Sequence, residues 1–159
     1  MGIQAYNGRI RRSPLDFGPL AVALGDPAGI GAEIVLKSLA RAGLNAPVVL
    51  VGCRRWLEEQ HRLLRVAGCT ALADPAGICM VDLPLAEPIT PGQTGAAAGA
   101  ASFAWLTQAT QLVLEGRCRA LVTAPIAKAS WQAAGHRYPG QTERLAELCG
   151  VGEASMLFT

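Results

Sequence analysis

Short apolar runs alternate with longer segments of helical periodicity along most of this chain. The runs are rich in aliphatic residues, and glycine or proline bounds most of them, which predicts buried β-strands. The predicted strands are residues 19–24, 47–52, 78–83 and 119–124, and the last residues, 154–159, begin to resemble a fifth. The predicted helices are residues 32–42, 54–68, 94–115, 127–134 and 142–149, with Gly43 expected as the C-cap of the first. This alternation is typical of βαβ units, so we expect an α/β fold with a parallel-rich sheet and helices on both faces.

The pentapeptide Asp-Pro-Ala-Gly-Ile occurs twice, at residues 26–30 and 74–78. The first copy follows an apolar run and leads directly into a predicted helix. Its glycines permit positive φ angles and a close approach of the backbone, and the N-terminal end of a helix attracts anions. The candidate ligand loop therefore comprises Gly25, Asp26, Gly29 and Gly31. The alternative is that this loop only caps the following helix.

The second copy has no clear apolar run before it and leads into a predicted strand instead of a helix. It is therefore predicted to be a turn with Pro75 at its second position and a positive φ angle at Gly77. The first copy matches neither standard nucleotide motif. Its glycines are spaced Gly-x-x-x-Gly-x-Gly, unlike the dinucleotide fingerprint, and Ala32 and Glu33 stand where a P-loop needs lysine and then serine or threonine.

A second candidate stretch covers residues 120–147. Lys128 is predicted near the N-terminus of a helix, where its charge opposes the helix dipole. This indicates a bound anion or a carboxylate partner, and an ordinary surface lysine is the alternative. Further along, Thr142 is predicted to be the N-cap of the last helix, with Glu143 in its first turn.

Four segments of the chain match the signatures of a known family in order and spacing. They are Gly25–Gly31 followed by Glu33, Pro91–Gly95, Ala120–Lys128 and Gly135–Glu143. Together they resemble the 4-hydroxythreonine-4-phosphate dehydrogenases of vitamin B6 biosynthesis, the PdxA family, over residues 19–159. The resemblance implies an isocitrate-dehydrogenase-like architecture, a homodimer, and NAD-dependent oxidation and decarboxylation of 4-phosphohydroxythreonine. It also implies a divalent metal (Zn, Mg or Co) that acts as a Lewis acid on the substrate oxygens.

Two departures from the family bear on the site. The family has His-Thr where this chain has Gln141-Thr142, and the resemblance implies that both positions contact the substrate. Glutamine can donate or accept a hydrogen bond but cannot exchange a proton near neutral pH. The resemblance also implies that the metal-binding histidines, the phosphate-binding lysine and arginine and most NAD contacts lie in a portion that this chain does not include. His61 and His136 are not expected to replace them.

These departures lead us to expect the N-terminal part of such an enzyme, apparently truncated and inactive alone. We expect no metal ligands in it, and its catalytic and NAD-contacting residues stay unassigned. Two alternatives remain open. One is a non-enzymatic remnant or interaction module with the same fold, and the other is an acyl-phosphate-type transferase on a related scaffold.

Composition narrows the class of protein further. The net charge of +2 is too close to balance to favour a nucleic acid or an anionic membrane as partner. The five cysteines are scattered without a Cys-x-x-Cys pair, which favours reduced thiols over disulfides or a zinc site. Three arginines lie within residues 1–18, the predicted basic N-terminal arm, and residues 19–159 form the predicted domain. Because no secretory signal or membrane span is recognised, we expect a cytoplasmic protein.

Overall fold

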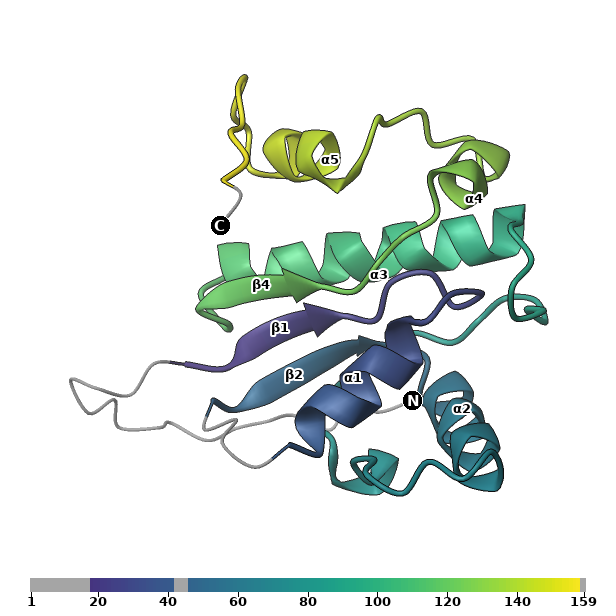
Figure 1. Cartoon of the computed structure of the whole chain (residues 1–159). Coiled ribbons are helices and arrows are strands. Elements are labelled where there is room, and N and C mark those ends of the chain that lie inside the picture. The colour runs from purple at the N-terminus through teal and green to yellow at the C-terminus, as the bar shows by residue number, and fades with distance from the viewer. Residues whose placement is uncertain (1–17, 42–45, 158–159) are drawn as a thin grey trace.

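The computed structural model describes residues 18–41 and 46–157, so the predicted arm, except for Gly18, and Gly43 lie outside the described residues. Strands and helices alternate through most of the fold, as Figure 1 shows along its colour ramp. In chain order the elements are β1 (Leu20–Ala23), α1 (Gly31–Leu39), β2 (Val48–Gly52), α2 (Arg54–Val66), the 3₁₀ turn η1 (Pro75–Gly77), β3 (Met80–Asp82), α3 (Ala96–Leu114), β4 (Ala120–Thr123), α4 (Lys128–Ala133) and α5 (Gln141–Leu148).

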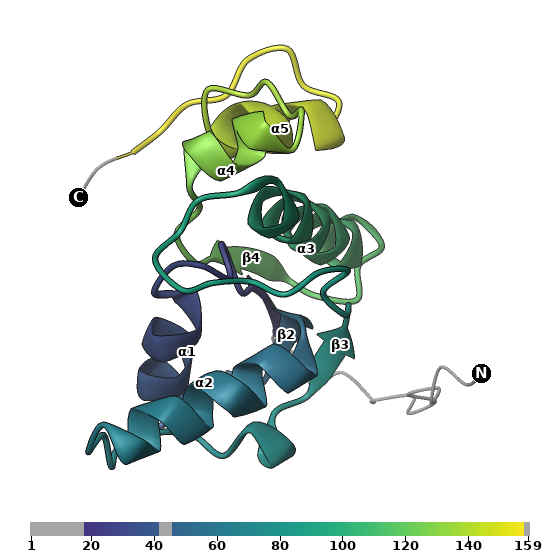
Figure 2. The same ribbon diagram turned by 90° about the vertical axis from the view of Figure 1, so that its right-hand side faces the viewer.

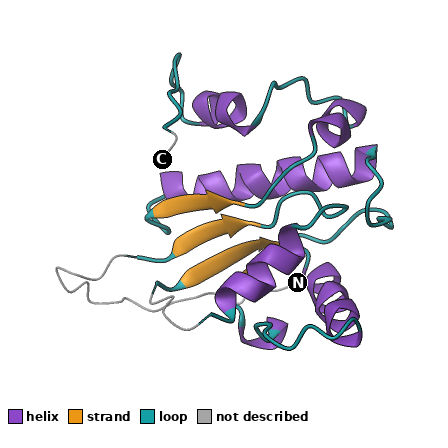
Figure 3. Cartoon of the chain, viewed as in Figure 1, coloured by secondary structure: helices purple, strands orange, loops and turns teal. Residues whose placement is uncertain are grey.

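The four strands form one parallel sheet in the order β3-β2-β1-β4. Figure 3 shows the strands of this sheet in orange, and Figure 2 shows α1 and α2 on one side of it and α3 on the other. This arrangement follows from right-handed crossovers. The chain moves outward from β1 to β3 through α1 and α2, and then returns past β1 to β4 through α3. The α/β class with a parallel sheet and helices on both faces is confirmed.

The core lies between the sheet and its helices, and α3 supplies much of it. Trp105, Leu106, Ala109 and Leu112 of this helix are almost fully buried. The indole Nε1 of Trp105 donates a hydrogen bond to the carbonyl oxygen of Leu83 at 3.2 Å, so its polar group is satisfied inside the fold. Burying aliphatic side chains of this size stabilises a fold by about 1.5–3 kcal/mol each, which makes α3 the main support of the sheet.

The backbones of α3 and α4 approach each other closely at Gly99. A Cβ atom at Gly99 would lie only 1.9 Å from the carbonyl oxygen of Ser130, so this position requires glycine. Beside this contact the indole Nε1 of Trp131 donates to Ser102 Oγ at 2.9 Å, and the Ser102 hydroxyl donates to the carbonyl oxygen of Gly99 at 3.1 Å. The two helices are therefore joined by backbone contact and by a buried hydrogen-bond chain.

Three local predictions are wrong. The first helix ends at Leu39 with Ala40 as its C-cap, because the buried face that holds it to the core extends no further than Leu36 and the partly buried Leu39. Gly77 does not have a positive φ angle; it ends the η1 turn instead. The strand expected at 154–159 is not present in residues 154–157, which are exposed, because an apolar run forms a strand only where a neighbouring strand supplies hydrogen bonds; residues 158–159 lie outside the described residues. Among the described helices, none is long and apolar enough to span a membrane.

Candidate functional site

The carboxyl ends of β1 and β4 bring two loops into contact. β1 and β4 pair in parallel, so the chain leaves both strands at the same edge of the sheet. The backbone N–H of Asp26 donates to the carbonyl oxygen of Pro125 at 2.9 Å. Gly25 has a φ angle of +77°, and a Cβ atom there would lie 2.4 Å from that same oxygen. The edge where parallel sheets bind ligands is thus built from residues that sequence analysis had assigned to two separate candidate stretches.

The glycines of the candidate ligand loop are close to the chain's own backbone. A Cβ atom at Gly31 would lie 2.1 Å from the carbonyl oxygen of Leu24. Positive φ is found at Gly25 and not at Gly29 or Gly31, the two glycines predicted to permit it. The close approaches that these glycines allow are therefore internal to the fold, and ligand contact by the loop stays a prediction.

Asp26 lies inside this loop instead of projecting from it. Its side chain is 3% exposed, and Oδ1 accepts a hydrogen bond from the N–H of Ala28 at 2.8 Å. The other oxygen, Oδ2, is buried and has no hydrogen-bond partner among the described residues. Asp74 makes the same turn in the second pentapeptide, accepting from the N–H of Ala76 at 3.0 Å, but there the side chain is exposed. The two copies share a local turn and differ in burial.

The N-terminus of α5 reaches back to the end of β4. Gln141 is the first residue of α5, and its Nε2 donates to the carbonyl oxygen of Ala124 at 3.4 Å. Its Oε1 is buried and has no partner among the described residues. Thr142 is not the N-cap as predicted, because the extended residue Gly140 takes that position and leaves Thr142 within the first turn. Glu143 lies in the first turn as expected.

Lys128 stands beside this helix N-terminus. It is the first residue of α4 and is exposed. A Cβ atom placed on Gly140 would lie 3.7 Å from Cε and 4.0 Å from Nζ of Lys128, so the amine is next to the residue that precedes Gln141. Within the described residues it forms no ion pair with a carboxylate. The structure thus places Lys128 beside Gly140, the residue before Gln141, and Oε2 of Glu143 lies 3.4 Å from the same Cβ position.

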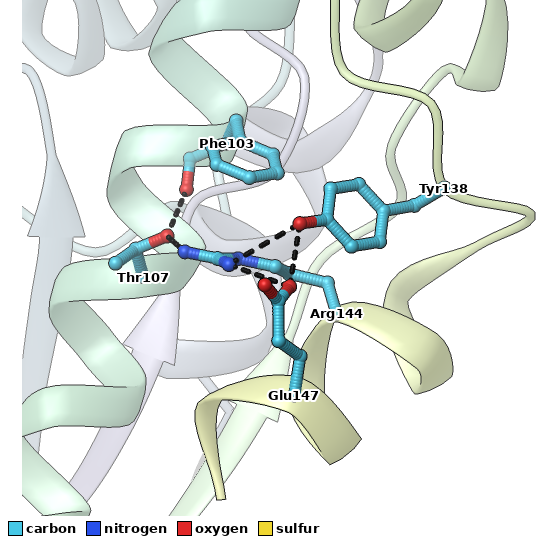
Figure 4. Close-up of polar contacts among 5 residues, drawn as sticks. All are labelled: Phe103, Thr107, Tyr138, Arg144 and Glu147. Atoms are coloured by element: carbon cyan, nitrogen blue, oxygen red, sulfur yellow. Dashed lines mark hydrogen bonds and ion pairs between the residues drawn. The ribbon is translucent and has the colours of Figure 1, made fainter. Parts of the chain in front are cut away.

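Arg144 fastens α5 to α3 (Figure 4). Its Nη1 donates to Glu147 Oε2 at 2.8 Å and lies 3.4 Å from the Tyr138 hydroxyl, and its Nη2 donates to Thr107 Oγ1 at 3.3 Å. Its Cζ lies 4.5 Å from the ring centroid of Phe103, within the range of a cation–π contact. The Tyr138 hydroxyl also donates to Glu147. We call these five residues the Arg144 cluster.

The Arg144 cluster is not predictable from the sequence. The only sequence signal is the spacing of Arg144 and Glu147, which is typical of any exposed helical ion pair. The partner that distinguishes it, Thr107, lies 37 positions away on another helix. The cluster anchors α5, whose first residue contacts the end of β4. It therefore holds that residue of the candidate site in position.

The packing of His136 predicts a pH dependence of stability. Its ring stacks on Phe103 with the centroids 3.6 Å apart, and burial, with a smaller effect of the Arg144 charge, lowers the pKa of His136 from its ordinary value of 6.5. The unfolded chain therefore binds this proton more readily than the folded chain does. The contribution of His136 to the free energy of unfolding should be complete above the ordinary pKa. It should decline as the pH falls through and below that pKa. Urea unfolding at a series of pH values from about 8 to about 5.5 measures this slope.

The variant His136→Gln provides the comparison. It removes the titrating ring, so its free energy of unfolding should change less over the same pH range. A variant with the same slope as the natural chain would contradict the assignment to His136. The ring of His136 packs on Phe103 of α3, whereas Gln141 reaches the carbonyl oxygen of Ala124 after β4.

Comparison with known proteins identifies the family. The family model for the pyridoxal phosphate biosynthetic protein PdxA matches residues 43–159. The chain belongs to the PdxA family. A 4-hydroxythreonine-4-phosphate dehydrogenase from Synechococcus sp. (strain RCC307) is 63% identical over 141 residues, which are 88% of this chain and 42% of that protein. A D-threonate 4-phosphate dehydrogenase from Salmonella typhimurium is 41% identical over 87% of this chain and 46% of its own length.

Solved structures of PdxA proteins have the same fold. A 4-hydroxythreonine-4-phosphate dehydrogenase from Burkholderia phymatum superposes with a TM-score of 0.76 at 32% sequence identity. The match covers 86% of this chain and 45% of that one. The chain thus spans less than half the length of the PdxA proteins it matches.

The residues present do not fit the metal that the family implies. Across residues 18–41 and 46–157 there is no group of three histidine, cysteine, aspartate or glutamate side chains that could hold a metal ion. The glycine loop does not fit a dinucleotide cradle either. Its spacing differs from the dinucleotide fingerprint, and its close approaches are to Leu24 and Pro125 of the chain itself.

Proposed function

We propose that this chain supplies one wall of the substrate site of a PdxA-type NAD-dependent dehydrogenase. The substrate would be 4-phosphohydroxythreonine, and the reaction its oxidation and decarboxylation in vitamin B6 (pyridoxal phosphate) biosynthesis. Family membership supports the class of reaction. The observation that carries the proposal is that Lys128 lies beside Gly140, while the next residue, Gln141, reaches the carbonyl oxygen of Ala124 just after β4.

Each residue of this wall has a proposed role. Lys128, whose ammonium group forms no ion pair within the described residues although the Glu143 carboxylate lies near it, offers that group to an anionic group of the substrate. Thr142 offers a hydroxyl as hydrogen-bond donor or acceptor. Gln141 positions the substrate through its amide and does not transfer a proton near neutral pH. The Arg144 cluster anchors α5, and the contact between α3 and α4 anchors α4. Together they hold these groups in position relative to one another. NAD and the divalent metal, when bound, would supply hydride acceptance and charge stabilisation from outside the residues described.

We also propose that residues 1–18 form a basic arm before a domain of residues 19–159, and that the complete protein is a cytoplasmic homodimer. The relative length of the PdxA matches supports a further proposal, that these 159 residues alone do not turn over substrate. The experiment is NADH formation by the purified chain with 4-phosphohydroxythreonine, NAD and added Zn, Mg or Co ions.

The expected result is no NADH above the rate without protein. The variant Gln141→His should also remain inactive, because a restored histidine does not restore the metal ligands. Turnover by either protein would overturn the proposal and place a working metal site within this chain. D-threonate 4-phosphate serves as a second substrate, since the Salmonella relative is named for it. Turnover of that substrate alone would correct the substrate assignment.

A further inference from the structure

The last helix, α5, is held to the rest of the fold by partly buried side chains. None of its eight described residues is fully buried, and Leu145 packs, partly buried, against the hydrophobic core. The helix before it, α4, is held differently, because its Trp131 is fully buried. Between the two helices the chain turns at Gly135, whose φ angle is +85°. Residues 135–148 therefore form a unit that can leave α3 without α4, and a helix of eight residues is not stable in water alone.

The ring of Phe103 on α3 receives two basic side chains of this unit. The imidazole of His136 stacks on it with the ring centroids 3.6 Å apart and the planes 4° from parallel. Cζ of Arg144 lies 4.5 Å from the centroid of the same ring (Figure 4). A protonated His136 would bring a second positive charge to this ring, next to the guanidinium group. Burial, and then the Arg144 charge, lower the pKa of His136 from its ordinary value of 6.5, in agreement with this geometry.

The surroundings of His136 offer no carboxylate to a protonated imidazole. α3 has no charged residue along its length. The charged and titratable side chains on α4, on α5 and on the segment between them are Lys128, Arg137, Tyr138, Glu143, Arg144 and Glu147. Glu147 already accepts hydrogen bonds from Arg144 Nη1 and from the Tyr138 hydroxyl, and Glu143 lies beside Gly140. In the part of the chain that the structure describes, His136 forms no ion pair.

We propose that the stack of His136 on Phe103 is an acid-sensitive latch, which releases residues 135–148 from α3 when the imidazole is protonated and leaves the sheet folded. Gln141 moves with α5, so opening of the latch withdraws its amide from the carbonyl oxygen of Ala124. The pH dependence of overall stability described above does not require a latch, since unfolding of the whole chain would produce it too. The inference rests on the packing of α5 and not on the proposed function.

The direction of the pH effect follows from the two states of the latch. When it is open, the imidazole of His136 is in water and has its ordinary pKa, and when it is closed, burial lowers that pKa. Protonation therefore favours the open state. The latch should be closed most firmly above the ordinary pKa and should open as the pH falls through it. One pH unit below that pKa, the ratio of open to closed molecules rises by at most about tenfold.

Hydrogen–deuterium exchange of the natural chain at about pH 7.5 and about pH 5.5 tests the proposal. Each amide is described by its protection factor, the ratio of its intrinsic exchange rate to its observed rate. We expect the amides of α5 to be at least about tenfold less protected than those of β2 at both pH values, because α5 opens without the sheet. Their protection should fall by about three- to tenfold between the two pH values. Equal protection of α5 and β2, or no fall in α5, would overturn the proposal.

Two variants assign the effect to the latch. His136→Phe keeps a ring on Phe103 but cannot be protonated, so the protection of α5 should change by less than about twofold between the two pH values. His136→Gln, which also cannot be protonated, should behave in the same way. His61→Gln is the matched control, because it removes a histidine on α2 and should keep the fall of the natural chain. A full fall in His136→Phe, or its loss in His61→Gln, would overturn the proposal.

Discussion

Gly31→Ala is expected to destabilise the fold by about 3 kcal/mol or more, a large part of the 5–15 kcal/mol typical of a domain. The new methyl carbon would lie 2.1 Å from the carbonyl oxygen of Leu24, which is main chain and cannot rotate away. Alanine gains at most about 1 kcal/mol of helix propensity over glycine, so the clash outweighs the gain. The start of α1 would have to move away from the end of β1, and the candidate ligand loop with it.

Gly77→Ala is the matched control for this prediction. Gly77 lies in the second pentapeptide and does not have a positive φ angle, and a Cβ atom added there would meet no heavy atom within 4 Å. Its replacement should change the free energy of unfolding by less than about 0.5 kcal/mol. Urea denaturation of the natural chain and the two variants measures both effects. Each appears as a shift of the urea concentration at the unfolding midpoint, with the dependence of the unfolding free energy on urea unchanged. Equal midpoints for Gly31→Ala and the natural chain would show that the loop relaxes freely and that the predicted clash is absent.

Trp131→Ala is expected to destabilise the fold by about 3–5 kcal/mol. The side chain is fully buried and contacts Phe103 edge to face, with the ring centroids 5.2 Å apart. Its removal leaves a cavity and deprives Ser102 Oγ of its hydrogen-bond donor. Because α4 has only six residues, it depends on this packing and not on its own propensity. The first residue of α4, Lys128, should therefore become mobile.

Two measurements check this prediction. Urea unfolding gives the loss of stability, and exchange of the amides of α4 shows whether that helix loosens before the sheet does. Gln132→Ala, at the exposed neighbouring position on the same helix, should stay within about 0.5 kcal/mol of the natural chain. A loss for Trp131→Ala no larger than that of Gln132→Ala would contradict the role assigned to the buried indole.

The sequence predicts the sheet well because its signal is local. Each of the four strands is an apolar run that ends at a turn, and each lies within one to two residues of its predicted bounds. The run at 154–159 has similar composition but no strand in residues 154–157, since strand formation requires a hydrogen-bonded neighbour that composition does not reveal. The end of α1 is displaced for a similar reason, because contact with the core and not propensity fixes it.

The site is less predictable, because its contacts join distant parts of the chain. Residue type and family resemblance single out Lys128 and Gln141, but only the structure places Lys128 beside Gly140, the residue before Gln141. Burial decides the rest. Identical pentapeptides give a buried Asp26 and an exposed Asp74, because only the first copy lies between the ends of two strands. The flanking residues predict which copy joins a strand to a helix, but they do not predict the burial of its aspartate.

The touching backbones at Gly99 and Ser130 have a consequence for how this protein can change. Main-chain atoms set the spacing between α3 and α4, and substitution elsewhere does not alter main-chain size. Lys128 lies two residues before Ser130 on the same helix, so the contact at Gly99 also fixes where its main chain stands relative to α3.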